Sequence, residues 1–155
     1  MRRRALIFIL TSVIFGSMAA IARSQTISGS ITGGAVSRGA KARGVITMNI
    51  PSGFHVNSNR PSSQYSIATT VRISGSGVRS ASVSYPRGRD RKFEFSETPV
   101  NVYQGTVTFP FSVNIPARYN GRSLKLRVVV HYQACTNEVC YPPKDKEISL
   151  SAAIR

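Results

Sequence analysis

TVTFPFSVNI, residues 106–115, alternates apolar and polar side chains along its whole length. LKLRVVVH, residues 124–131, repeats this alternation, and so does ISLSAAI, residues 148–154. Successive side chains of a β-strand point to opposite faces, so a period of two predicts strands that are buried on one face. We therefore expect three half-buried antiparallel strands here. Pro110 has no N–H to donate, which predicts a sheet edge or a bulge at its position.

Weaker alternations of the same period occupy residues 45–50, 67–73 and 78–84. Turn motifs with glycine or proline separate the segments and lie at residues 51–53, 75–77, 86–88 and 120–121. About seven short strands at spacings of about 8 to 12 residues are typical of a two-sheet sandwich. The predicted fold class is therefore all-β, an immunoglobulin-like antiparallel β-sandwich in a single domain.

The composition fits a small folded domain. The chain has 155 residues, with 21 Lys and Arg against 6 Asp and Glu, for a net charge of +15. This length suits one compact domain. Only two cysteines and two histidines occur, which excludes disulfide-dense and zinc-array classes.

Residues 1–22 have the pattern of an export signal peptide. Three arginines precede an apolar run, and Ala20-Ile21-Ala22 supplies the small residues of a cleavage site. An uncleaved membrane anchor is the alternative, although Thr, Ser and Gly interrupt the run. We expect cleavage near Arg23, a mature chain without a transmembrane segment, and a periplasmic location. Residues 23–43, rich in Ser, Gly and Ala, are expected to be a flexible N-terminal segment, and residues 44–155 the folded domain.

Export limits the partners that the basic charge can meet. Removing the three arginines of the signal peptide from the 21 basic residues leaves 18 against 6 acids, a net charge of +12. We expect no nucleic-acid partner, because neither a basic helix nor aromatic residues interleaved with the charges occur. An acidic protein or the anionic membrane surface fits better, through long-range steering. A solvated basic face without function is the alternative.

Catalytic motifs are scarce outside the cysteines. The six acids offer no carboxylate pair, and neither a glycine-rich phosphate loop nor a G-x-S-x-G motif occurs. His55 and His131 are interpreted as strand residues with one exposed ring edge. A metal site of His131, Cys135 and Cys140 would lack a fourth ligand, so we predict neither a metal nor a cofactor.

Cys135 and Cys140 follow the 124–131 strand with four residues between them. An exported cysteine pair this close normally oxidises, and a structural disulfide is the simplest interpretation. Closing so short a loop removes unfolded-state entropy worth only about 2 kcal/mol, so the bridge would stabilise the fold weakly. A pair that stays close in both redox states instead suits exchange, in which one thiolate attacks a disulfide and the other thiol resolves the mixed disulfide. The spacing alone leaves both interpretations open.

YQACTNEVCYPP, residues 132–143, closely resembles the Y-Q-x-C…C-Y-P-P signature of the N-terminal periplasmic domain of DsbD-type thiol:disulfide interchange proteins. GFHVNSNRP at residues 53–61, YPRG at 85–88 and KFEFSE at 92–97 resemble the same domain in the same order. The resemblance covers approximately residues 44–154.

This resemblance implies an immunoglobulin-like sandwich with a redox-active Cys135/Cys140 dithiol that needs no cofactor. By motif position, Cys140 would form the mixed disulfide with partners and Cys135 would resolve it, as in a thiol:disulfide oxidoreductase that relays electrons. The implied donor is a membrane-linked thioredoxin-like module. The implied acceptors are periplasmic disulfide isomerases or thioredoxin-like proteins of cytochrome c maturation. Family members continue into a membrane section and a thioredoxin-like domain, whereas this chain ends at Arg155, so we expect the donor to be a separate protein.

The resemblance also indicates supporting residues. An aromatic side chain from a neighbouring loop shields the cysteines in the family, and Phe93 or Phe95 would take that place here unless both are ordinary core. Three carboxylates would disfavour the thiolate if they lie near the sulfurs: Glu94, Glu97 and Glu138. Three further residues are expected to fix the shape of the cysteine loop: Tyr132, Tyr141 and Pro142.

One rival function comes from another class. A non-catalytic envelope binding or assembly module would carry Cys135–Cys140 as a structural disulfide. It predicts a very low reduction potential and unfolding on reduction, whereas a relay stays folded in both redox states.

Overall fold

The computed structural model describes residues 24–63, 66–78 and 80–155. These residues form strands, turns and loops without any helix, so none of the described segments is a helix able to cross a membrane. The predicted signal peptide, residues 1–22, lies outside the described residues. The all-β prediction is confirmed.

The first sheet contains four antiparallel strands in the order β1 (Thr26–Ile31), β3 (Lys41–Ile50), β9 (Gly105–Asn114) and β6 (Ala81–Val83). Its centre is the pairing of β3 with β9, which runs from Lys41 opposite Asn114 to Ile50 opposite Gly105. These two strands have the clearest alternation of buried and exposed residues in the sheet, as the period of two predicts.

The second sheet has the order β2 (Ala35–Val36), β12 (Lys144–Ile154), β10 (Ser123–Tyr132) and β5 (Thr70–Ser74). Its pairs are antiparallel except for the short parallel pair of β2 with β12. The strands predicted at residues 124–131 and 148–154 are β10 and β12, which pair along the whole of β10.

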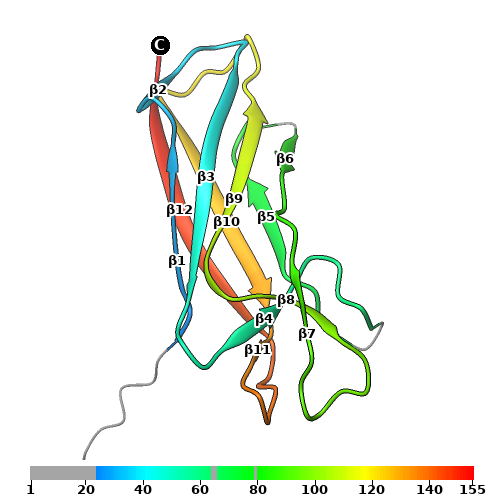
Figure 1. Cartoon of the computed structure of the whole chain (residues 1–155). Helices are drawn as coiled ribbons and strands as arrows, with labels where there is room; N and C mark the ends of the chain where they lie inside the picture. Colours follow the sequence, from blue (N-terminus) through cyan, green and yellow to red (C-terminus); the bar gives the residue numbers. More distant parts are fainter. Residues whose placement is uncertain (1–23, 64–65, 79) are drawn as a thin grey trace, which may run out of the picture.

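The two sheets pack face to face as an immunoglobulin-like sandwich (Figure 1). Their inner side chains form one core, whose fully buried members include Ile46, Met48, Phe109, Leu124, Leu126 and Val128. Burying one such side chain stabilises the fold by about 1.5–3 kcal/mol, so this core is the main source of stability.

A third sheet lies at the end of the sandwich where β10 ends (Figure 1). Its order is β11 (Ala134–Cys135), β4 (His55–Asn57), β8 (Val100–Tyr103) and β7 (Arg89–Arg91). The row Ala134–Val56–Tyr103 faces the main core, whereas the next row, Cys135–His55, faces the opposite side. One face of the third sheet therefore packs against the main core, and the opposite face, which we call the cysteine side, carries Cys135 and His55.

The prediction that residues 23–43 form a flexible segment is wrong for the described part, residues 24–43. Strand β1 pairs with β3 along its full length, from Thr26 opposite Asn49 to Ile31 opposite Gly44. The small residues permit close packing here: a Cβ on Gly29 would lie 2.8 Å from the Ile46 side chain and 2.9 Å from the Val45 carbonyl oxygen. The Gly and Ser content reflects this packing, and the folded domain begins before residue 44.

The prediction of an edge or a bulge at Pro110 is wrong for the strand as a whole, because β9 lies between β3 and β6. The proline is accommodated because β6 ends at Val83, next to it. The Pro110 carbonyl still accepts a hydrogen bond from the Ser84 N–H at 2.8 Å. Its missing N–H therefore falls where the β6 ladder has already ended.

Candidate redox site

The two cysteines are joined across a short hairpin that follows β10. Cys135 and Cys140 form a disulfide and lie opposite each other as an antiparallel bridge, with their Cα atoms 4.0 Å apart. The Thr136 N–H donates to the Val139 carbonyl at 2.8 Å, and the Tyr141 N–H donates to the Ala134 carbonyl at 2.9 Å. Backbone hydrogen bonds on both sides of the cysteines thus close the hairpin independently of the sulfurs.

The turn of this hairpin is held by Thr136. Its hydroxyl oxygen accepts hydrogen bonds from the backbone N–H groups of Glu138 at 3.3 Å and Val139 at 3.2 Å. A Thr side chain that bonds the backbone of its own turn replaces water at these donors. The turn between the cysteines is therefore specified locally.

Gln133 anchors the hairpin to β4. Its amide nitrogen donates to the Tyr141 carbonyl at 3.2 Å, and its amide oxygen accepts from the Asn57 amide at 3.5 Å. Asn57 also donates to the Ile67 carbonyl at 3.1 Å. The sequence analysis assigned no role to Gln133 or Asn57. Both lie within motifs that resemble the family, and these motifs are the signal from which a role could have been predicted.

The two cysteines differ in access to solvent. Cys135 is 1% exposed, whereas Cys140 lies among the exposed residues of the hairpin. Val139 and Tyr141, which flank Cys140, are exposed large hydrophobic residues. A partner that approaches from solvent thus meets Cys140 first, beside apolar side chains on which it can dock.

Both predicted cap residues lie in the loop of residues 92–99 between β7 and β8, which we call the cap loop. The Phe93 ring stacks on the His55 ring, with centroids 4.1 Å apart and planes at 15°. The Phe95 ring lies beside both rings with nearly parallel planes, its centroid 5.2 Å from that of Phe93 and 6.3 Å from that of His55. Phe93 is 7% exposed and Phe95 45% exposed. The stack covers the residue opposite Cys135, with Phe93 as its inner ring and Phe95 as its outer ring.

His55 differs from the sequence prediction, which gave it an exposed ring edge. It is 1% exposed, because Phe93 covers its ring. Burial lowers its pKa to about 4. Its Nε2 is buried and has no hydrogen-bond partner among the described residues. Two other buried polar atoms of the described residues also lack a partner, Gln25 Nε2 and the Tyr132 hydroxyl.

His131, the other histidine, lies apart from this arrangement. It is on β10, partly exposed, and its Nδ1 lies 2.7 Å from the Asp145 carboxylate. No group of His, Cys, Asp and Glu side chains placed to hold a metal ion occurs among the described residues.

The other residues predicted for the site divide between core and surface. Tyr132 is fully buried in the main core, where burial raises its pKa and leaves its hydroxyl unpartnered. The Tyr141 ring lies 6.1 Å from the Phe54 ring, tilted by 38°. The remaining predicted residues are exposed: Pro142, Glu94, Glu97 and Glu138.

Two hollows adjoin the hairpin. A groove of about 250 Å³ is lined by Ser24, Gln25, Phe54, Ala134, Tyr141, Pro142 and Lys144. A second hollow of about 350 Å³ separates Phe93 and Glu94 of the cap loop from Asn137 of the cysteine turn. The cap loop and the cysteine turn therefore face each other across open space.

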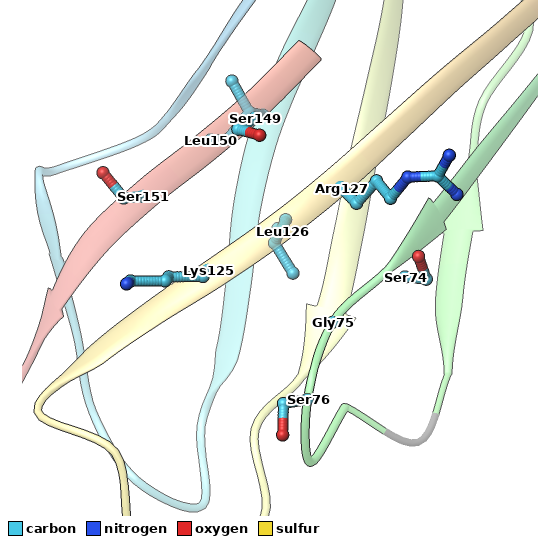
Figure 2. A pocket seen from close by; sticks show the side chains of 9 residues that line it. All are labelled: Ser74, Gly75, Ser76, Lys125, Leu126, Arg127, Ser149, Leu150 and Ser151. Atoms are coloured by element: carbon cyan, nitrogen blue, oxygen red, sulfur yellow. The ribbon is translucent and has the colours of Figure 1, made fainter. Parts of the chain in front are cut away.

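A shallower depression of about 720 Å³ lies elsewhere, on the outer face of the second sheet near the start of β10 (Figure 2). Figure 2 shows serine side chains around Leu126, together with the basic side chains of Lys125 and Arg127. Its lining is Ser74, Gly75, Ser76, Lys125, Leu126, Arg127, Ser149, Leu150 and Ser151. Neither cysteine nor any cap-loop residue belongs to it, so it is not part of the redox site.

A β-sandwich that carries a half-buried, half-exposed disulfide on a self-closed hairpin has the features of a thiol:disulfide exchange domain. The family model described as "Thiol:disulfide interchange protein DsbD, N-terminal" matches residues 32–152. The chain belongs to this family.

Two solved structures are similar to the chain. The N-terminal periplasmic domain of ScsB from Proteus mirabilis is 15% identical over 83% of this chain and 46% of that one, with a TM-score of 0.58, which shows a shared fold. This chain thus spans less than half of the ScsB structure. The N-terminal domain of Neisseria meningitidis DsbD in the reduced form is 21% identical over 71% of this chain and 77% of that one, with a TM-score of 0.44. Among curated proteins, none matches the chain.

Proposed function

We propose that the chain is a periplasmic thiol:disulfide exchange protein that relays reducing equivalents through the Cys135/Cys140 dithiol. The observation that carries the proposal is the unequal burial of the two bonded cysteines on a hairpin that its own backbone closes. Membership of the DsbD N-terminal family supports the chemistry. The export pattern of residues 1–22 supports the location.

In the first half of the relay, the oxidised chain takes up two electrons from a membrane-linked thioredoxin-like donor. A donor thiolate attacks the exposed Cys140 sulfur, the Cys135–Cys140 bond breaks, and Cys135 leaves as a thiolate that takes a proton. The second thiol of the donor then attacks the donor sulfur that is bonded to Cys140. This attack breaks the mixed disulfide and releases Cys140. The donor is oxidised to a disulfide and this chain is reduced to a dithiol.

In the second half, the reduced chain passes the electrons to an exported disulfide. The Cys140 thiolate attacks the acceptor disulfide, and Cys135 then attacks the Cys140 sulfur and expels the reduced acceptor. The acceptors are proposed to be disulfide isomerases or thioredoxin-like proteins of cytochrome c maturation. Because the backbone holds the hairpin closed, Cys135 stays within reach of Cys140 throughout the cycle.

The cap loop is proposed to control access. Its backbone turns on itself through the Ser96 N–H, which donates to the Phe93 carbonyl at 3.2 Å, and through the Lys92 ammonium, which donates to the Glu97 carbonyl. A loop closed by its own bonds can swing aside as a unit when a partner docks. Glu138 lies in the turn between the cysteines and Glu94 lines the hollow opposite that turn, and their negative charge is proposed to disfavour the thiolate between encounters.

The reduction potential of the Cys135/Cys140 pair tests the proposal. The purified protein is equilibrated in glutathione or dithiothreitol buffers, its thiols are trapped, and circular dichroism is recorded on both end states. A potential of roughly −180 to −270 mV with both states folded is the expected result for a relay. A potential below about −300 mV, or unfolding on reduction, would instead indicate a structural disulfide in an envelope binding or assembly module.

A further inference from the structure

His55 lies on the same face of the third sheet as Cys135. The two residues are directly opposite each other on β4 and β11, and opposite residues of an antiparallel pair point their side chains to the same side. Their Cβ atoms are therefore about 5 Å apart. Every redox step at the buried cysteine takes place beside this imidazole.

The imidazole is held in place and kept dry. Phe93 stacks on it at 4.1 Å, Phe95 lies 6.3 Å from it, and Val100 and Val102 form a small apolar cluster with Phe93. The residue is 1% exposed, so bulk solvent is excluded from the ring while the cap loop is closed. Any hydrogen-bond partner of the ring must come from the protein itself.

In the disulfide form, Nε2 of His55 lacks such a partner within the described chain. Buried polar atoms in folded proteins are almost always paired, so an unpaired nitrogen in this position needs a physical reason. A disulfide sulfur has no proton to donate and accepts hydrogen bonds only weakly. Reduction changes this, because the Cys135 thiol then carries a proton on the same face of the sheet.

The surroundings favour a neutral pair between these groups. Burial lowers the pKa of His55 to about 4 and likewise disfavours a buried thiolate, so an uncharged imidazole faces an uncharged thiol at neutral pH. Burial, and not a neighbouring charge, is the cause of the His55 shift. The charged groups on the elements packed around it are Arg89, Asp90 and Arg91 of β7, Lys92, Glu94 and Glu97 of the cap loop, and Glu138 of the cysteine turn.

We propose that His55 receives the Cys135 thiol proton during resolution of the mixed disulfide. The inference rests on the proposed exchange function. The proton passes from Cys135 Sγ to His55 Nε2 while the Cys135 sulfur attacks Cys140 Sγ, so that no free thiolate forms in the buried site. The Cys135–Cys140 bond forms, the bond from Cys140 to the partner breaks, and the partner leaves as a thiolate. That thiolate takes the proton from the imidazolium, either directly or through solvent that accepts one proton and delivers another, so that His55 returns to its neutral form. The dithiol is oxidised and the partner disulfide is reduced, with two electrons transferred.

The reaction of the reduced protein with 5,5′-dithiobis(2-nitrobenzoate) separates the two steps. Attack by Cys140 releases one coloured thionitrobenzoate, and resolution by Cys135 releases the second. We expect His55→Gln, which keeps a hydrogen-bond acceptor but loses the base, to slow the second release by at least about tenfold and to change the first by less than about twofold. The pH profile of the second release should move to higher pH. His131→Gln, at the exposed histidine of β10, is the matched control and should behave like the wild type.

The outcomes distinguish this inference from the proposed function. If the wild-type protein releases no second thionitrobenzoate, the exchange function itself fails. If the wild type resolves and His55→Gln resolves at the same rate with the same pH profile, only the role of His55 is overturned. His55→Phe, which retains an aromatic ring for Phe93, replaces His55→Gln if the latter does not fold. In the wild type, the ¹⁵N shift of Nε2 must also change on reduction, and an unchanged shift would likewise overturn the inference.

Discussion

Cys135 and Cys140 face each other across a hairpin whose flanking hydrogen bonds belong to their neighbours. Thr136 with Val139 and Ala134 with Tyr141 supply those bonds, so the cysteines occupy a non-hydrogen-bonded pair of the ladder. Side chains approach most closely at such a pair. The disulfide therefore forms where the backbone already brings the sulfurs together.

Reduction should leave the domain folded. Because the bridge closes a loop with a sequence separation of only 5, its removal should lower the free energy of unfolding by about 2 kcal/mol. Urea unfolding followed by far-ultraviolet circular dichroism, with and without dithiothreitol, measures this difference. Collapse of the β-sheet signal in dithiothreitol would contradict it.

The two single-cysteine variants should react unequally. Cys135→Ser leaves the exposed Cys140 and should form a stable mixed disulfide with oxidised glutathione. Cys140→Ser leaves the buried Cys135 and should react more slowly by on the order of tenfold or more, since access controls thiol reactivity. Mass spectrometry of the adducts over time gives both rates. Equal rates would remove the case for Cys140 as the partner-facing cysteine.

The long alternating segments could be predicted from the sequence because a period of two extends over ten residues in β9 and β10. The strands around the site could not: β4 and β11 have three and two residues, too few to show any period. Strand β1 was missed because its Gly and Ser residues, which permit close packing on β3, have the composition of a flexible segment. The burial of His55 depends on Phe93, which is distant in sequence and brought over it only by the fold.

Gln133 should hold the two arms of the hairpin in place. Gln133→Leu removes its bonds to the Tyr141 carbonyl and the Asn57 amide, which should lower stability by about 1 kcal/mol. Hydrogen exchange at the Tyr141 N–H should accelerate, because the hairpin opens more often. Gln104→Leu, at an exposed glutamine, is the matched control. Similar exchange in both variants would show that the hairpin does not depend on Gln133.

Substitution of the two phenylalanines of the cap loop should affect stability and thiol access differently. Phe93→Ala removes a buried ring and should destabilise the domain by about 3 kcal/mol, whereas Phe95→Ala, at an exposed ring, should cost less than about 1 kcal/mol. Because the cap loop is proposed to control access to the cysteines, Phe95→Ala should still speed alkylation of the reduced thiols by iodoacetamide. Urea unfolding and alkylation rates test the two effects separately. A Phe95→Ala protein that is stable and alkylated at the wild-type rate would leave shielding to Phe93 alone.

Protonation of His55 should lower the stability of the domain as the pH drops below neutral. Its pKa is about 4 in the folded protein and 6.5 in the unfolded chain, so between these values the unfolded state binds more protons. The stabilisation is thus complete above pH 6.5 and is lost as the pH falls toward 4. Between neutral pH and pH 5 this loss amounts to about 2 kcal/mol. Urea unfolding at both pH values measures it, with His55→Phe as the variant that keeps the stacked ring and cannot titrate. The variant should lose about 2 kcal/mol less than the wild type over this range, and an identical pH dependence in both proteins would show that His55 titrates normally.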